Sequence, residues 1–131
     1  VRAYMDRTVT EARNRGYTET LFGRRRPIPE LTSDNFRIRQ AGERQAMNAG
    51  IQGLAADIFK IALVRIDRDL EAAGLSARLV LQVHDEVIVE APLKEKQQTE
   101  DIVLGIMRGA ADLSVPLEVN SAWGATWAAA K

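Results

Sequence analysis

The sequence predicts an α+β fold, a small antiparallel sheet with helices packed on one face of it. Two observations carry this prediction. Apolar residues recur at helical spacing in three segments, and short runs rich in β-branched residues come in pairs around tight connections. The resulting order is helix, two strands, helix, two strands, helix and a last strand, which suits two packed layers. A chain of 131 residues fits a single domain.

The first helix is expected over residues 2–15, where apolar side chains follow i, i+4 spacing and Gly16 comes next as a stop. A strand over 17–22, a turn over 23–25 and a second strand over 26–30 should follow. Only an edge position suits this second strand, because the prolines in it cannot donate a hydrogen bond to a neighbouring strand.

A long helical segment is expected from about residue 35 to residue 73. Thr, Ser, Asp and Asn occupy positions 32–35, and all four residue types cap helix N-termini. Gly74 stands where helices often end. Gly50 and Gly53 lower the helix propensity in the middle, so a bend or a break into two helices is expected there.

Two antiparallel strands are expected over 79–83 and 87–91, with a tight connection through residues 84–86. A short strand should follow near the end of the chain at 117–119. A further amphipathic helix is expected after Pro92, marked by apolar residues at positions 102, 103, 106, 107, 110 and 113.

The composition excludes several classes of site. The chain has no cysteine and one histidine, which excludes disulfides, thiolate metal sites and a multi-histidine zinc site. No apolar run approaches the roughly 20 residues that span a bilayer, so no membrane partner is expected. The start at Val1, directly in a helical pattern and unlike a signal peptide, favours a piece of a longer protein over a processed terminus.

The net charge is zero, but the charges are unevenly distributed. Residues 1–44 carry ten arginines and six acidic residues, whereas residues 45–91 carry four basic and seven acidic ones. A basic region beside an acidic one suits an enzyme that binds a polyanion and divalent cations. It also arises by chance.

Asp85 and Glu86 lie between two strongly apolar strands. Adjacent carboxylates in such a place are either solvated at a hairpin tip or bound to a cation, because desolvating them unpaired is unfavourable. Hard cations such as Mg²⁺ prefer carboxylate oxygens. Because successive strand residues point to opposite faces, only one of the two carboxylates needs to face a metal ion.

Arg44, Asn48 and Gln52 form a row on one side of the long helix, at i, i+4 and i+8. These side chains either form a solvated face or donate to the acceptors that all base pairs share in the minor groove. His84, the lone histidine, is either a satisfied polar residue at a strand end or part of a site. Asp57 falls near the apolar face, and we expect an arginine partner for it.

Several runs together resemble the DNA polymerases of family A, including their bacterial members. Gln82-Val83-His84-Asp85-Glu86-Val87 is similar to motif C of that family. The run from Glu43 to Ile58 resembles the helix before that motif, and the run from Gly16 to Arg25 resembles the fingers-to-palm segment. The resemblance covers essentially the whole chain.

The resemblance implies a piece of a polymerase domain, with residues 1–43 as the fingers-to-palm segment and residues 44–131 as the palm. The implied activity is template-directed addition of deoxynucleotides to a primer 3′ end by two-metal phosphoryl transfer, in replication and repair. Asp85 would be one of two aspartates that hold two Mg²⁺ ions, and Glu86 would support it. His84 would lie by the primer terminus.

The same resemblance makes minor-groove contact the preferred interpretation of Arg44, Asn48 and Gln52. The implied partners are primer–template DNA, deoxynucleoside triphosphates and an upstream part of the polymerase, and the implied place is the bacterial cytoplasm, at the nucleoid. Gly50 departs from the proline common in the family, and Leu54 from a small hydroxyl residue.

The second metal-binding aspartate and the nucleotide-binding helix of the family have no counterpart in this sequence. A different expectation therefore stands beside the first, namely a non-catalytic duplex-binding or structural fragment. An unrelated metal phosphohydrolase is disfavoured, because such sites use further histidines.

Overall fold

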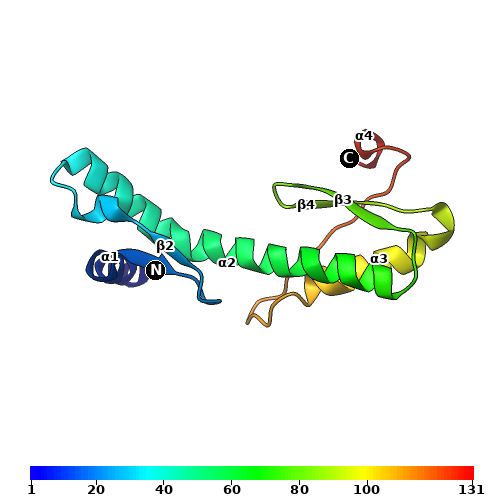
Figure 1. The fold of residues 1–131 in the computed structure, drawn as a ribbon, viewed down its shortest axis with the longest axis horizontal. Coiled ribbons are helices and arrows are strands. Elements are labelled where there is room, and N and C mark those ends of the chain that lie inside the picture. Colours follow the sequence, from blue (N-terminus) through cyan, green and yellow to red (C-terminus); the bar gives the residue numbers. More distant parts are fainter. The chain divides into compact units, whose positions relative to one another are not determined.

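The computed structural model describes all residues, 1–131. The chain forms two compact units, Val1–Asp57 and Ile58–Lys131. One long helix, α2 (Phe36–Ala72), contributes its first part to unit 1 and its last part to unit 2 (Figure 1).

Unit 1 begins with α1 (Arg2–Arg15), as the sequence predicts. The helix ends at Gly16, whose φ of 84° is a left-handed conformation that glycine adopts without a steric penalty. The N–H of Gly16 donates to the carbonyl of Ala12 and so satisfies one of the last helical acceptors.

A hairpin of two short strands follows, β1 (Tyr17–Glu19) and β2 (Arg25–Pro27). They pair antiparallel, with Thr18 opposite Arg26. The predicted strand over 26–30 is wrong beyond Pro27, because residues Pro29–Thr32 form the 3₁₀ helix η1. Proline suits the first position of a helical turn, and this turn buries Leu31 completely.

Helix α2 starts at the predicted capping cluster. The Oδ1 atom of Asn35 accepts from the N–H of Arg37 at 3.0 Å, which satisfies a donor of the first turn. Of the expected bend or break, the break into two helices is wrong, since α2 runs through Gly50 and Gly53 over 37 residues. These glycines provide room for neighbouring side chains.

A stripe of small residues on α2, at positions 42, 46, 49 and 53, allows other segments to approach the helix closely. A methyl group on Gly53 would lie 2.6 Å from Cγ2 of Thr20, and one on Gly42 would lie 3.0 Å from Cβ of Glu30. Ala46, between them, is fully buried. Ala46 of this stripe belongs to the core of unit 1, whose other members are Val9, Ala12, Ile28, Leu31 and the partly buried Met47.

Unit 2 starts with the last turns of α2. At their end Leu75 N–H donates to the carbonyl of Leu70, and Gly74 N–H donates to that of Glu71. Gly74 has a φ of 70°. These two bonds are the pattern of a Schellman motif, so Gly74 ends the helix as predicted.

The strands β3 (Arg78–Val83) and β4 (Glu86–Glu90) form the second antiparallel hairpin, close to the predicted bounds. Leu79 pairs with Val89 and Leu81 with Ile88, so Val80 is an extra residue in β3. Such a bulge shifts the alternation of side chains by one residue.

Helices cover one face of this hairpin. The core of unit 2 joins Ile66 and Leu70 of α2 to apolar residues of both strands and of α3 (Lys96–Arg108). The short 3₁₀ helix η2 (Leu93–Glu95) precedes α3, and Glu95 accepts two backbone hydrogen bonds from the loop after α2. The predicted packing of helices on one sheet face is therefore present in unit 2.

The predicted α+β class of small antiparallel pairing and helices is confirmed, and one predicted strand is wrong. The chain contains two separate two-stranded sheets rather than one small sheet. Residues 117–119 form no strand, because no other segment pairs with them, and the chain ends after the short helix α4 (Trp127–Ala130). No helix of the structure is long and apolar enough to cross a membrane.

Gly53→Ala should destabilise unit 1 by about 1–3 kcal/mol. The new methyl group would push a threonine side chain that other hydrogen bonds hold in place. Gly50→Ala is the matched control, because its nearest neighbour is the hydroxyl of the half-exposed Tyr4, at 3.1 Å, which is free to move away. Its gain in helix propensity, about 0.5–1 kcal/mol, should raise stability. Thermal unfolding measures both effects, and equal melting temperatures would contradict this account.

Candidate functional site

The tip of the β3–β4 hairpin carries the predicted carboxylates. Val83 pairs with Glu86, so His84 and Asp85 form a two-residue turn. His84 has a φ of 51°, the sole positive value at a residue other than glycine. The side-chain amide of Gln82 donates to the carbonyl of His84 at 2.8 Å and so braces the turn from inside the strand.

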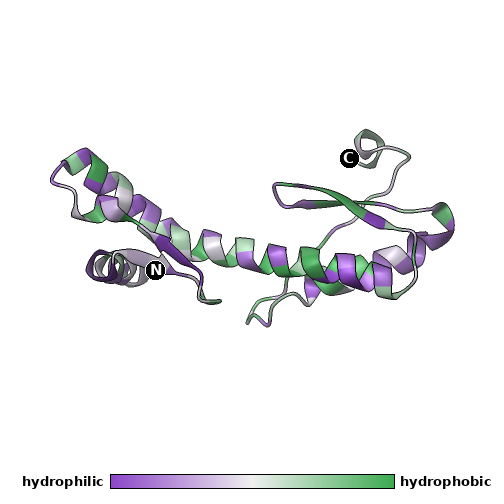
Figure 2. Cartoon of the chain, in the orientation of Figure 1, coloured by the Kyte–Doolittle hydropathy of each residue, from purple (hydrophilic) through white to green (hydrophobic).

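Asp85 and Glu86 are both exposed, and neither forms an ion pair within the chain. The strands behind them are mostly hydrophobic, whereas the turn is hydrophilic (Figure 2). No group of three or more His, Cys, Asp or Glu side chains gathers around one point. The turn thus presents two solvated carboxylates whose oxygens are available to a cation.

The row Arg44, Asn48 and Gln52 lies on the part of α2 that belongs to unit 1. All three side chains are exposed, and none forms a hydrogen bond or an ion pair with another residue. The small residues of α2 pack toward the rest of unit 1 instead. The row is therefore a surface of unused donors at one-turn intervals.

Beside this row, a cluster of polar groups joins the β1–β2 hairpin to α2. Asp57 is 8% exposed, and its two carboxylate oxygens accept from Nε of Arg24 and from the hydroxyl of Thr20, each at 2.6 Å. Arg24 also donates to the carbonyl of Gly53 at 3.2 Å. The expectation that Asp57 pairs with an arginine is confirmed.

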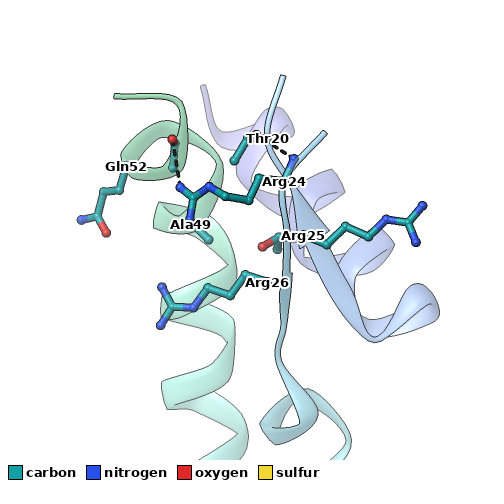
Figure 3. A pocket seen from close by; sticks show the side chains of 8 residues that line it. Thr20, Arg24, Arg25, Arg26, Ala49 and Gln52 are labelled. Atoms are coloured by element: carbon teal, nitrogen blue, oxygen red, sulfur yellow. Dashed lines mark hydrogen bonds between the residues drawn. The ribbon is translucent and has the colours of Figure 1, made fainter. Parts of the chain in front are cut away.

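The three consecutive arginines have different surroundings. Arg25 stacks on the ring of Tyr17 at 4.6 Å, with Glu19 at 3.9 Å. Arg26 forms no hydrogen bond, ion pair or ring contact through its side chain. Figure 3 shows Arg25 and Arg26 pointing to opposite sides, as successive strand residues do.

The sequence-predicted residues form two sets. His84, Asp85 and Glu86 lie together at the tip of one hairpin in unit 2. The row on α2 lies in unit 1. From the sequence, Arg24, Arg25 and Arg26 are either a solvated turn or a phosphate contact; the hollow that they line beside Gln52 could not be predicted and is visible only in the structure.

The chain is similar to known polymerases over its whole length. The family model "DNA polymerase family A" matches residues 1–129. DNA polymerase I of Bacillus subtilis is 52% identical over 131 residues, which are 100% of this chain and 15% of that protein. DNA polymerase I of Mycobacterium leprae is 49% identical over 130 residues, 99% of this chain and 14% of that protein.

One solved structure, the POL domain of Pol1 from M. smegmatis in complex with DNA primer-template and dNTP, aligns with a TM-score of 0.93 at 47% identity. The alignment covers 98% of this chain and 23% of that one. The fold is thus that of a part of a polymerase domain. The chain belongs to DNA polymerase family A, and it spans about one seventh of the length of the curated relatives.

His84→Gly should leave the hairpin folded, because glycine adopts a positive φ without strain. His84→Val should destabilise it by about 1–2 kcal/mol, since a β-branched residue is strained in the left-handed region. Thermal unfolding compares the two variants, with His84→Asn as a further control that tolerates this region. Equal stability of the Gly and Val variants would show that the turn does not need this conformation.

Proposed function

We propose that this chain is part of a DNA-directed DNA polymerase that adds deoxynucleotides to a primer 3′ end. The observation that carries the proposal is the pair Asp85 and Glu86, exposed at the tip of the β3–β4 hairpin within a chain of family A. The M. smegmatis relative, bound to primer-template and dNTP, supports the same substrates for this chain. The chain covers about one seventh of the relatives' length, which supports a further part of the polymerase as partner.

The donor chemistry of the turn fits Mg²⁺. Carboxylate oxygens are hard ligands, and this ion commonly takes one or two of them together with water and substrate phosphates. Asp85 would hold the metal ions, and Glu86 would contact them or their water. Since no third acidic or histidine ligand gathers here, a second aspartate from outside this chain would complete the site.

Two divalent ions, when bound, would neutralise charge on the transferred phosphate and lower the pKa of the primer 3′-hydroxyl. The residues of this chain position the reacting groups. The positive φ of His84 and the hydrogen bond from Gln82 restrict the backbone of the turn, and this would orient the side chain of Asp85. His84, at the same tip, would contact the primer terminus.

Arg44, Asn48 and Gln52 would hold the duplex. Their free donors, one helical turn apart, suit the N3 and O2 acceptors that every base pair presents in the minor groove. Contacts of this kind sense duplex geometry rather than base identity. We assign residues 1–43 to the fingers-to-palm segment and residues 44–131 to the palm. We further propose that the polymerase acts in replication and repair at the bacterial nucleoid.

A second candidate function is a non-catalytic duplex-binding or structural role for the chain by itself. It rests on the absence of a third acidic or histidine ligand beside Asp85 and Glu86. The isolated chain should then support no primer extension. Extension by the purified chain, at a rate proportional to its concentration, would overturn this expectation. A salt-dependent affinity for primer–template would favour duplex binding, and its absence a structural role.

Asp85→Asn in the full-length polymerase should lower the rate of nucleotide addition by about a thousandfold, because an amide is a much weaker ligand for a hard cation. Affinity for primer–template should stay near that of the parent. Glu86→Gln, the same change at the neighbouring residue, should have a smaller effect. Single-turnover primer extension separates these outcomes, and near-parental rates for Asp85→Asn would refute the metal-ligand role.

Gln52→Ala should weaken primer–template binding about 5- to 10-fold, the range for loss of a hydrogen bond to a base edge. The salt dependence of binding should stay unchanged, because glutamine neutralises no phosphate. Gln98→Ala is the control, since it makes the same change on an exposed position of α3. Fluorescence anisotropy with labelled duplex measures both. Equal affinities would remove Gln52 from the interface.

A further inference from the structure

A hollow in unit 1 lies between the β1–β2 hairpin and α2. Its lining includes Thr18, Thr20, Arg24, Arg26, Gln52 and Gly53, together with Arg25 and Ala49. No acidic side chain lines it. Three consecutive arginines around one hollow without a lining carboxylate create a positive potential there, which favours an anion.

The three positive charges are not equally available. Arg24 is neutralised by Asp57 at 2.6 Å. Arg25 lies against Tyr17, and Glu19 partly balances its charge from 3.9 Å. Arg26 is exposed and has no partner, so it is the free cation of the hollow.

The backbone holds Arg26 in place although its side chain is free. Its strand position is paired with Thr18, which is 8% exposed. Pro27 follows and restricts the residue before it to an extended conformation. The Arg24–Asp57 ion pair, two residues away, ties the same hairpin to α2. The guanidinium thus extends from a rigid base.

Arg26 and Gln52 line the same hollow, and in Figure 3 both point to the same side of the hairpin while Arg25 points away. Gln52 belongs to the row that we assign to the minor groove. That groove is about 6 Å wide and is walled by phosphates. A cation beside a groove-contacting glutamine therefore lies within reach of a backbone phosphate.

We propose that Arg26 binds a backbone phosphate of the primer–template duplex, at the edge of the groove that Gln52 contacts. The planar guanidinium suits bidentate contact with two phosphate oxygens. This inference rests on the proposed function and adds a residue and a ligand group to it. The triphosphate of an incoming nucleotide offers the same phosphate oxygens and is the alternative ligand for Arg26.

Arg26→Gln in the full-length polymerase should weaken duplex binding about 3- to 10-fold at low salt. At high salt the Kd values of the variant and the parent should become equal. The slope of log Kd against log salt should fall by about one, as expected for one lost phosphate contact. Arg25→Gln removes the same charge from the neighbouring residue and should leave the slope unchanged. Arg26→Lys should recover the slope and part of the affinity.

Equal slopes for Arg26→Gln and Arg25→Gln would overturn the proposal. A raised KM for deoxynucleotide with unchanged duplex affinity would also overturn it, since the phosphate would then be that of the nucleotide. The proposed polymerase function fails on a different result, an Asp85→Asn variant that still extends primers. Melting temperatures of the Arg26 variants within about 2 °C of the parent exclude a folding defect.

Discussion

The ion pair between Arg24 and Asp57 is the interaction on which the structure of residues 1–57 depends. A carboxylate that is 8% exposed is stable only with charged or hydrogen-bonded partners, and Arg24 and Thr20 both supply hydrogen bonds of 2.6 Å. Arg24 also reaches the carbonyl of Gly53. Arg24, in the connection between β1 and β2, is thereby bonded to two successive turns of α2, and these bonds hold the hairpin against the helix.

The two hairpins carry opposite charges on rigid supports. The β1–β2 hairpin presents arginines, and the connection before β2 is held by a buried acid. The β3–β4 hairpin presents Asp85 and Glu86 on a turn braced by Gln82. The proposed polymerase function would use both kinds of surface, cationic donors for a polyanion and carboxylates for the metal ions that accompany phosphoryl transfer. The zero net charge of the chain conceals this division.

Local patterns predicted α1, α2, α3 and both hairpins, because caps, glycine stops and β-branched runs act within a few residues. They failed where distant contacts decide. Gly50 and Gly53 suggested a bend or a break, yet the helix is unbroken and Gly53 accommodates Thr20, which lies far away in the sequence. The bulge at Val80 also reverses simple alternation, so Leu79 faces the core while Leu81 is 46% exposed.

The assignment of the candidate site rests on a different kind of evidence and stays a prediction. Asp85, taken alone, was compatible with an ordinary solvated turn, and its functional assignment came from an ordered set of motifs. The partner of Asp57 could be predicted as an arginine but not as Arg24, since only the folded hairpin brings that residue near.

The small residues of α2 at positions 42, 46, 49 and 53 have a consequence for natural variation. Volume limits these positions, so glycine should be retained at position 53 among orthologues, where a methyl group would meet Thr20, and residues larger than alanine should be eliminated by selection at positions 46 and 49.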